Sequence, residues 1–203
     1  MPEEIHDELD RRLFHLKTLY DVSHDLLGIV EVKAILKNFL MMTTGNFGVI
    51  EGFILTQDIS SEEITHFVSV GFGTNERAEL KEHGNRLLLD LKKDGVVVNG
   101  HIIEDTGILP PAIVCALPFP VDEACLGLLG LGSKIVDEPY SDDDKDLLET
   151  LANNLVVFLK NARATEALKE AYEEVSSLNK AKDKVINHLS HELKTLLAAG
   201  PVR

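Results

Sequence analysis

Polar residues whose side chains could take part in a reaction lie near the C-terminus, in the stretch "NHLSHELKTLLAAG" (residues 187–200). A neutral imidazole such as that of His191 has a free lone pair at pH 7 and can attack a phosphoryl group, provided that the proton on its other ring nitrogen is held or taken. Thr195 follows four residues later, hence on the same helix face, where its hydroxyl can position a water. A histidine on an exposed helix is more often a plain surface residue, so the surroundings of His191 must decide its role.

One long helix must position His191. Ser141 can cap its start, Asp142 to Asp144 complement the positive end of the helix dipole, and no glycine or proline follows before Gly200. Apolar steps of three and four run through Leu148, Leu151, Leu155, Phe158, Ala162 and Thr165. After a local irregularity they resume at Leu168, Ala171, Val175, Leu178, Lys182, Val185 and Leu189. At about 1.5 Å per residue this helix is too long for one globular domain, so we expect it to leave its domain and pair with another helix.

The N-terminus carries a second heptad pattern, from about Glu3 to Gly28. Its seam comprises Leu9, Leu13, Leu16, Tyr20, Ser23, Leu27 and Val30. A second amphipathic helix, "VEVKAILKNFLMMTTG", should end at Gly45. Heptads near both ends of the chain predict a parallel homodimer.

The middle of the chain has the period of strands. "FGVIEGFILTQD" and "ITHFVSVGFG" are short β-rich runs, and "VVVNGHII" is a further strand candidate. "AIVCALPFPVDEACLGLLGLGSK" predicts a hairpin that turns near residues 120–122, with strands covered on both faces or nearly so. Helical spacing returns in "ERAELKEHGNRLLLDLKKDG". We predict an α+β fold, an antiparallel sheet flanked by helices, with long coiled-coil helices at both termini.

Composition excludes several classes of protein. The chain has 203 residues, of which 44% are hydrophobic and 27% charged, typical of a soluble globular protein. Its net charge of −14 argues against binding to nucleic acid or to an anionic membrane surface. The sequence contains neither a stretch of membrane-span length nor a secretory signal pattern at its N-terminus. We therefore expect a cytoplasmic protein.

Residues from about Leu19 to Arg163 resemble a GAF domain, a small-molecule sensory module. The resemblance is carried by "ALPFPVDEACLGLLGLGSK" and "PYSDDDKDLLETLANNLVVFLKNAR", which follow the family pattern of an lPl strand, a turn, an lGvLsl strand and a helix. It implies a pocket between the sheet and its covering helices and loops, with residues 76–101 as the lid. The ligand stays open, because the cyclic-nucleotide signature of some GAF domains is not recognisable.

Cofactor sites in that domain are an alternative hypothesis. His66, His83 or His101 could ligate a haem, and Cys115 or Cys125 could anchor a tetrapyrrole as in bilin-binding GAF relatives. Neither cysteine is followed by the histidine that those relatives usually show. We favour two buried, reduced thiols, and we expect no metal site and no bound cofactor in this chain.

The stretch "INHLSHELKTLLAA" resembles the H-box of sensor histidine kinases, F-x-x-x-x-S-H-E-L-[RK]-T-P-L. The match covers Ser190 to Thr195 and Leu197. It implies that His191 is the phosphoacceptor, Glu192 its acid–base neighbour and Thr195 the polar residue one turn on. Leu196 replaces the family's proline, so we expect a straighter helix. The family binds ATP and Mg²⁺ in a separate domain that the sequence up to Arg203 does not contain, so we expect the chain to be inactive alone.

Together the two resemblances predict the sensory and phosphoacceptor part of a two-component sensor histidine kinase. We expect an N-terminal coiled-coil helix (1–28), a GAF sensory domain (29–160) and a signalling helix with a truncated HisKA H-box segment (161–203). A small ligand would control autophosphorylation of His191 and transfer to an aspartate of a response regulator receiver domain. The alternative is a non-enzymatic GAF dimer, a ligand-binding or assembly module in which the histidine is incidental.

Overall fold

The protein combines a four-stranded antiparallel sheet with helices on both of its faces. A computed structural model describes residues 2–93, 101–104 and 107–198. The elements in chain order are α1 (Pro2–Leu26), α2 (Val32–Phe47), β1 (Gly52–Asp58), β2 (Ile64–Val70), α3 (Thr74–Lys93), β3 (Ile113–Asp122), β4 (Cys125–Gly132) and α4 (Asp142–Ala198). The strands pair in the order β2-β1-β4-β3. The predicted α+β architecture with an antiparallel sheet, flanking helices and a long C-terminal helix is confirmed.

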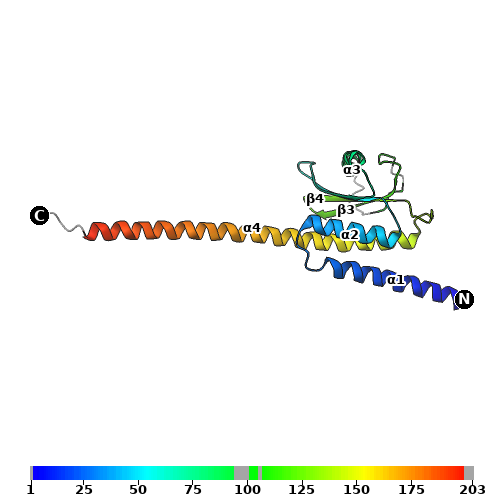
Figure 1. The fold of residues 1–203 in the computed structure, drawn as a ribbon, viewed down its shortest axis with the longest axis horizontal. Helices are drawn as coiled ribbons and strands as arrows, with labels where there is room; N and C mark the ends of the chain where they lie inside the picture. The colour runs from blue at the N-terminus through cyan, green and yellow to red at the C-terminus, as the bar shows by residue number, and fades with distance from the viewer. Residues whose placement is uncertain (1, 94–100, 105–106, 199–203) are drawn as a thin grey trace. The chain divides into compact units, whose positions relative to one another are not determined.

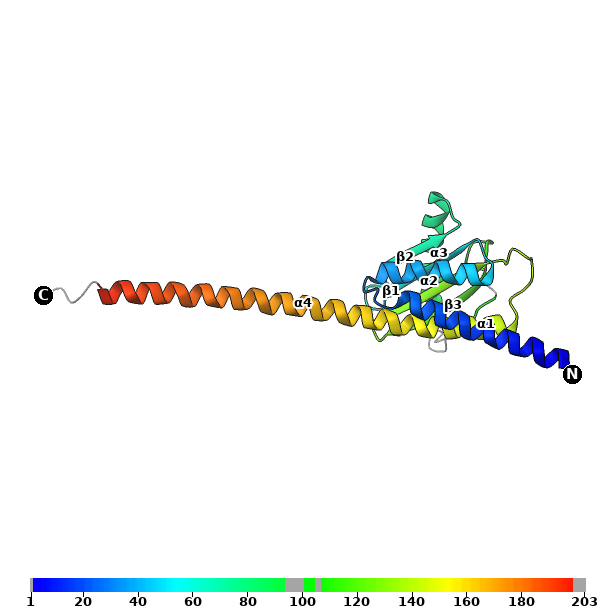
Figure 2. The ribbon, with the colours of Figure 1, turned by 60° about the horizontal axis from the view of Figure 1, so that its bottom comes forward.

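An apolar layer covers each face of the sheet. On one face α2 and the first part of α4 pack against the strands, and Val22 and Leu26 of α1 join the same buried cluster (Figures 1 and 2). On the other face α3 packs over a smaller cluster around Phe53 and Leu55. β4 is buried along its whole length, as its continuous apolar run predicts.

Two element boundaries differ from the prediction. α2 does not end at Gly45 but continues to Phe47, and Gly48 caps it in a left-handed conformation (φ 61°). Phe47 is buried, and its burial outweighs the roughly 1 kcal/mol that a glycine costs inside a helix. The β3–β4 turn lies at residues 123–124 rather than 120–122, because Pro120 and Asp122 still pair with β4.

The apolar repeat of α4 has two different roles along the helix. The chain divides into two compact units, residues 1–162 and 163–203. Leu148, Leu151 and Leu155 are buried in the core of the first unit, so this part of the repeat does not serve a partner helix, contrary to our expectation. In the second unit the large apolar residues whose side chains the structure describes are more than half exposed: Leu168, Tyr172, Val175, Leu178, Val185, Ile186, Leu189 and Leu193. The irregularity of the repeat near Thr165 falls beside the division between the units.

The outer side of α1 is also apolar and uncovered within this single chain. Six residues of the predicted seam are more than half exposed, the last two of them just after the end of α1: Leu9, Leu13, Leu16, Tyr20, Leu27 and Val30. Among the described residues, no helix has the length and apolar character that crossing a membrane requires.

Candidate functional site

The helix that carries His191 starts from a well-built cap. The Ser141 hydroxyl accepts a hydrogen bond from the Asp144 amide (3.2 Å), and the Asp144 carboxylate accepts one from the Ser141 amide (2.7 Å). Lys134 donates to the same carboxylate at 2.6 Å. Burial acts to raise the pKa of Asp144, but the hydrogen bonds from Lys134 and Ser141 outweigh it and lower the pKa. The predicted cap at Ser141 is therefore present, and Lys134 anchors it to the end of the sheet.

His191 lies near the end of α4, and its side chain is exposed. Thr195 lies one turn further on, and its hydroxyl donates a 2.9 Å hydrogen bond to the backbone carbonyl of His191 rather than to the imidazole. Glu192 belongs to the same helix, but its side chain lies outside the described residues. The helix continues through Leu196 to Ala198, as expected where leucine replaces a helix-breaking proline. The structure thus displays His191 and Thr195 together on an exposed helix.

The layer between α3 and the sheet is the predicted place for a ligand. Of the predicted lid, residues 76–93 form most of α3, and residues 94–100 lie outside the described residues. α3 approaches the sheet closely at Gly84, where an added Cβ would lie 2.5 Å from Leu55 Cδ2. Leu80, Leu87 and Leu88 of α3 are buried against the strands. The described part of α3 packs directly on the sheet, and the pocket expected beneath this segment stays a prediction.

Three buried polar atoms interrupt that apolar layer. Gln57 is fully buried, and its amide nitrogen donates to Asn85 Oδ1 (2.7 Å) and to the Glu62 carbonyl (3.4 Å), whereas its Oε1 has no hydrogen-bond partner among the described residues. The same holds for Nδ1 of His83 on α3 and Oγ of Ser69. Ser69 is opposite Phe53 in the β1–β2 pair, hence on the face that α3 covers. These atoms are groups that a polar ligand or water could satisfy.

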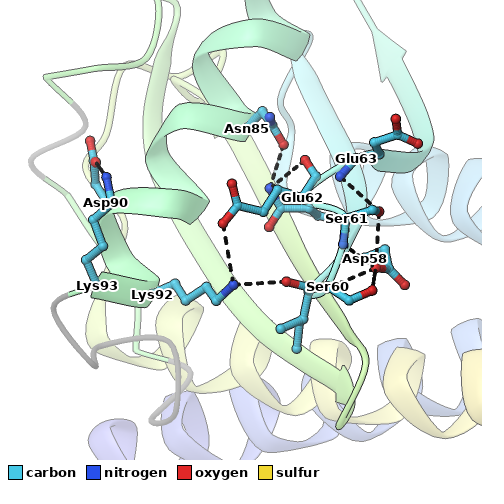
Figure 3. Close-up of polar contacts among 11 residues, drawn as sticks. Asp58, Ser60, Ser61, Glu62, Glu63, Asn85, Asp90, Lys92 and Lys93 are labelled. Atoms are coloured by element: carbon cyan, nitrogen blue, oxygen red, sulfur yellow. Dashed lines mark hydrogen bonds and ion pairs between the residues drawn. The ribbon is translucent and has the colours of Figure 1, made fainter.

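Polar contacts tie α3 to the β1–β2 hairpin (Figure 3). Lys92 donates to the Ile59 carbonyl (3.0 Å), and its ammonium lies 3.8 Å from the Glu62 carboxylate. Asp58 shapes the turn by accepting hydrogen bonds from the amides and hydroxyls of Ser60 and Ser61, at 2.5 to 3.1 Å. These hydrogen bonds, with that of the Ser60 hydroxyl foremost, lower the pKa of Asp58 to about 2. This connection was not predicted, and its only signal in the sequence is the Asp-x-Ser-Ser turn at residues 58–61.

The cysteines and histidines considered as cofactor ligands are separated or enclosed. Cys115 and Cys125 are both buried, and burial raises the pKa of Cys115 from 9.0 to about 12. His66, His83 and His101 lie respectively on β2, on α3 and before β3. Within the described part of the chain, no group of three or more His, Cys, Asp or Glu side chains is arranged to hold a metal ion.

A hollow lies between α1 and the start of α4, on the far side of the sheet from α3. Its volume is about 480 Å³, and its lining includes Arg11, Lys134, Asp143 and Asp144. The charges there pair with one another, Arg11 with Asp143 at 3.3 Å and Lys134 with Asp144 at 2.6 Å. This pairing makes the hollow a poor candidate for a charged ligand.

The fold is similar to that of solved GAF domains. A GAF domain assigned to a sensor histidine kinase of Pseudomonas syringae pv. tomato shares 19% identity, with a TM-score of 0.57 over 82% of this chain and 99% of that one. The GAF domain of a phosphoenolpyruvate-protein phosphotransferase from Coxiella burnetii gives 16% identity and a TM-score of 0.53, over 76% and 98% of the two chains. Residues 122 to 287 of a methyl-accepting chemotaxis protein give 14% and 0.52, over 72% and 99%.

These similarities establish a GAF-like fold for the chain. At such low sequence identity the similarities support an assignment of the fold and not of an activity. No protein-family model matches the sequence, and no curated protein matches it significantly.

Proposed function

We propose that this chain is the sensory and phosphoacceptor part of a two-component sensor histidine kinase. The GAF-like domain senses a small ligand, and His191 receives a phosphoryl group and passes it to an aspartate of a response regulator. The observation that carries the proposal is the sequence "SHELKT" on the exposed surface of a helix that begins inside a GAF-like domain. The role of Glu192 as acid–base partner comes from the H-box resemblance.

The chemistry requires an accessible neutral imidazole. Its unprotonated ring nitrogen attacks the γ-phosphorus of ATP, the bond from that phosphorus to the β–γ bridging oxygen breaks, and ADP leaves. The proton on the other ring nitrogen then passes to a base, the task we assign to Glu192. The exposed position of His191 supports the requirement for access. In the second step an aspartate carboxylate oxygen of the receiver attacks the phosphorus, the N–P bond breaks, and the imidazole leaves in its neutral form after the other ring nitrogen has regained a proton.

The apolar surface of α4 supports a dimeric helical assembly around this histidine. Between Leu168 and Lys182 a seam of period 3.5 suits pairing with one other helix. From Val185 onward the apolar face is wider, because Ile186 and Leu193 lie next to the seam residues Val185 and Leu189. All four side chains are more than half exposed. A broader apolar face suits a bundle in which each helix contacts more than one neighbour. We therefore assign the second unit to a homodimer that becomes a bundle near His191.

ATP and Mg²⁺ are expected for the complete kinase and would be held by a separate ATP-binding domain. The described residues of this chain do not fit that task, since they hold no cluster of metal-ligating side chains and the sequence has no GxxxxGK[ST] loop. What this chain supplies is the nucleophile, its acid–base neighbour and the helix that presents them.

The test joins residues 1–203 in frame to the second dimerisation helix and ATP-binding domain of a known sensor histidine kinase. We expect ATP-dependent labelling that is acid-labile and base-stable, that His191→Ala abolishes, and that a receiver domain removes. His188→Ala is the matched control, because His188 is an exposed histidine one turn earlier on the same helix. Unchanged labelling after His191→Ala would leave the non-enzymatic ligand-binding or assembly dimer as the better account.

A further inference from the structure

A short segment between α3 and β3 grips the first turns of α4. The Lys145 ammonium lies 2.6 Å from the Glu104 carboxylate, and His101 Nδ1 lies 3.7 Å from the Glu149 carboxylate. Glu104 and His101 thus contact one face of α4 one turn apart. We call residues 101–104 together with Lys145 and Glu149 the α4 clasp.

The clasp is fixed to the sheet through its backbone and to α4 through its side chains. Ile103 exchanges two hydrogen bonds with Ala116 of β3, at 2.7 and 3.0 Å. Ile102 packs against the buried cluster that includes Leu148 and Leu151 of α4. The segment therefore connects β3 and α4 through both backbone and side-chain contacts.

Lys145 is an unusual choice of residue at its position. It lies in the first turn of α4, directly after Asp142, Asp143 and Asp144, where the helix dipole disfavours a cation. Its side chain is only 28% exposed. The hydrogen bond to Glu104, helped by Asp142, raises the pKa of Lys145 and keeps it charged. A cation in this unfavourable place is explained by the carboxylate of Glu104 that it holds.

We infer that the α4 clasp transmits conformational changes from the α3 side of the sheet to α4. Breaking its contacts with α4 alters the rate of phosphorylation of His191. This inference rests on the proposed kinase function. Residues 101–104 lie between α3 and β3 in the chain, and they contact the helix that later carries His191. A partly exposed ion pair contributes little free energy to either of two conformations. A ligand with a modest preference for one conformation can therefore open or close such a contact.

Cys115 reports on the clasp without any kinase activity. It is 1% exposed, it precedes the clasp partner Ala116, and the charges of Glu104 and Lys145 both act on its thiol. Cys125 lies at the opposite end of the β3–β4 hairpin and serves as the internal control. The experiment treats the whole chain with N-ethylmaleimide under native conditions and measures labelling of each cysteine by peptide mass spectrometry.

The variants are Glu104→Lys, Lys145→Glu and the swap that combines them. We expect each single variant to raise the Cys115 labelling rate about two- to fivefold, the ratio expected for a partly exposed ion pair, and the swap to restore it. Glu79→Lys, an equal charge change at an exposed position of α3, should leave the rate unchanged. The clasp would be contradicted if Cys115 were labelled at the same rate in all variants. It would also be contradicted if the labelling rate of the swap were no closer to that of the unmodified chain than the rates of the single variants.

The same variants in the kinase fusion test the transmission step. We expect the two single variants to shift the rate of His191 labelling by a similar factor and the swap to return it to the unmodified rate, while the melting temperature changes little. If His191 labels at the same rate in all of them although Cys115 labelling differs, the clasp exists but does not transmit, and the inference is wrong. If no fusion labels at His191, the proposed function itself fails.

Discussion

The Thr195 hydroxyl donates a hydrogen bond to the backbone carbonyl of His191, 2.9 Å away, across one turn of α4. This back-bond places the hydroxyl on the face that displays the imidazole, but with its proton directed at the main chain. The oxygen retains lone pairs that can accept a hydrogen bond from a water near the imidazole. The geometry therefore suits a residue that positions water for hydrolysis and takes no part in the attack on ATP.

Thr195→Ala should lengthen the lifetime of phosphorylated His191 without preventing its formation. Loss of one water-positioning hydrogen bond, worth ~1 kcal/mol, slows hydrolysis about three- to tenfold. Thr195→Ser keeps the hydroxyl and should retain the original rate. The measurement follows decay of the label in the kinase fusion after ATP is removed. A lifetime that Ala and Ser lengthen equally would assign the effect to the lost methyl group instead.

Leu178→Glu should weaken the dimer that we assign to α4. Leu178 lies in the exposed apolar seam, and a parallel dimer would bury two carboxylates there without partners. The dissociation constant should rise by about 100-fold or more, a cost of ~3 kcal/mol. Ser177→Glu adds the same charge beside the seam and should change it little. Light scattering over a dilution series provides the constants, and a monomeric unmodified chain at micromolar concentration would contradict the prediction.

Lys182→Leu should tighten the same dimer. Lys182 follows Leu168 and Val175 at seven-residue intervals, so in a parallel dimer in register the two Lys182 ammonium groups would meet in the seam. Replacing them with leucine should lower the dissociation constant about tenfold, or ~1.4 kcal/mol. Lys184→Leu, two residues further and off the seam, is the control. Equal tightening by both variants would indicate nonspecific apolar association.

Gln57 and Asn85 should behave as a coupled pair in unfolding experiments. Gln57→Leu leaves Asn85 without its 2.7 Å donor, and Asn85→Leu leaves the buried Gln57 amide with only the longer hydrogen bond to the Glu62 carbonyl. Each single variant should lower the free energy of unfolding by about 1–3 kcal/mol, whereas the double variant should regain most of the loss. Urea unfolding measures all four proteins. Losses that simply add would show that the hydrogen bond does not hold α3 on the sheet.

The elements that follow from local pattern were predictable from the sequence. The acidic start of α4 and its freedom from glycine and proline predicted one long helix, and the apolar hairpin predicted the buried strands β3 and β4. The stop at Gly45 was wrong because tertiary burial of Phe47 overrides the local cost of glycine. A three-four repeat has the same form whether it faces its own domain or a partner. Leu151 and Leu178 therefore could not be distinguished before the core was known.

The contacts between distant residues were beyond sequence reasoning. Gln57 and Asn85 are 28 positions apart, and no periodic pattern connects them. The Glu104–Lys145 contact is equally non-local, although a lysine after three aspartates at a helix start is a signal that a partner carboxylate is needed. The exposed helical position of His191 followed from a local pattern on one helix, which requires no knowledge of the tertiary fold, whereas its role as phosphoacceptor stays a prediction.

The most direct test of the central claim locates the phosphate itself. The kinase fusion is labelled with ATP and digested at neutral to mildly basic pH, and electron-transfer fragmentation of the peptide spanning residues 185–194 assigns the modified residue. We predict a phosphoramidate on His191 and none on His188 or Ser190. A phosphate found on His188, on Ser190, or on no residue of this peptide in a fusion that hydrolyses ATP would contradict the assignment of His191 as the phosphoacceptor.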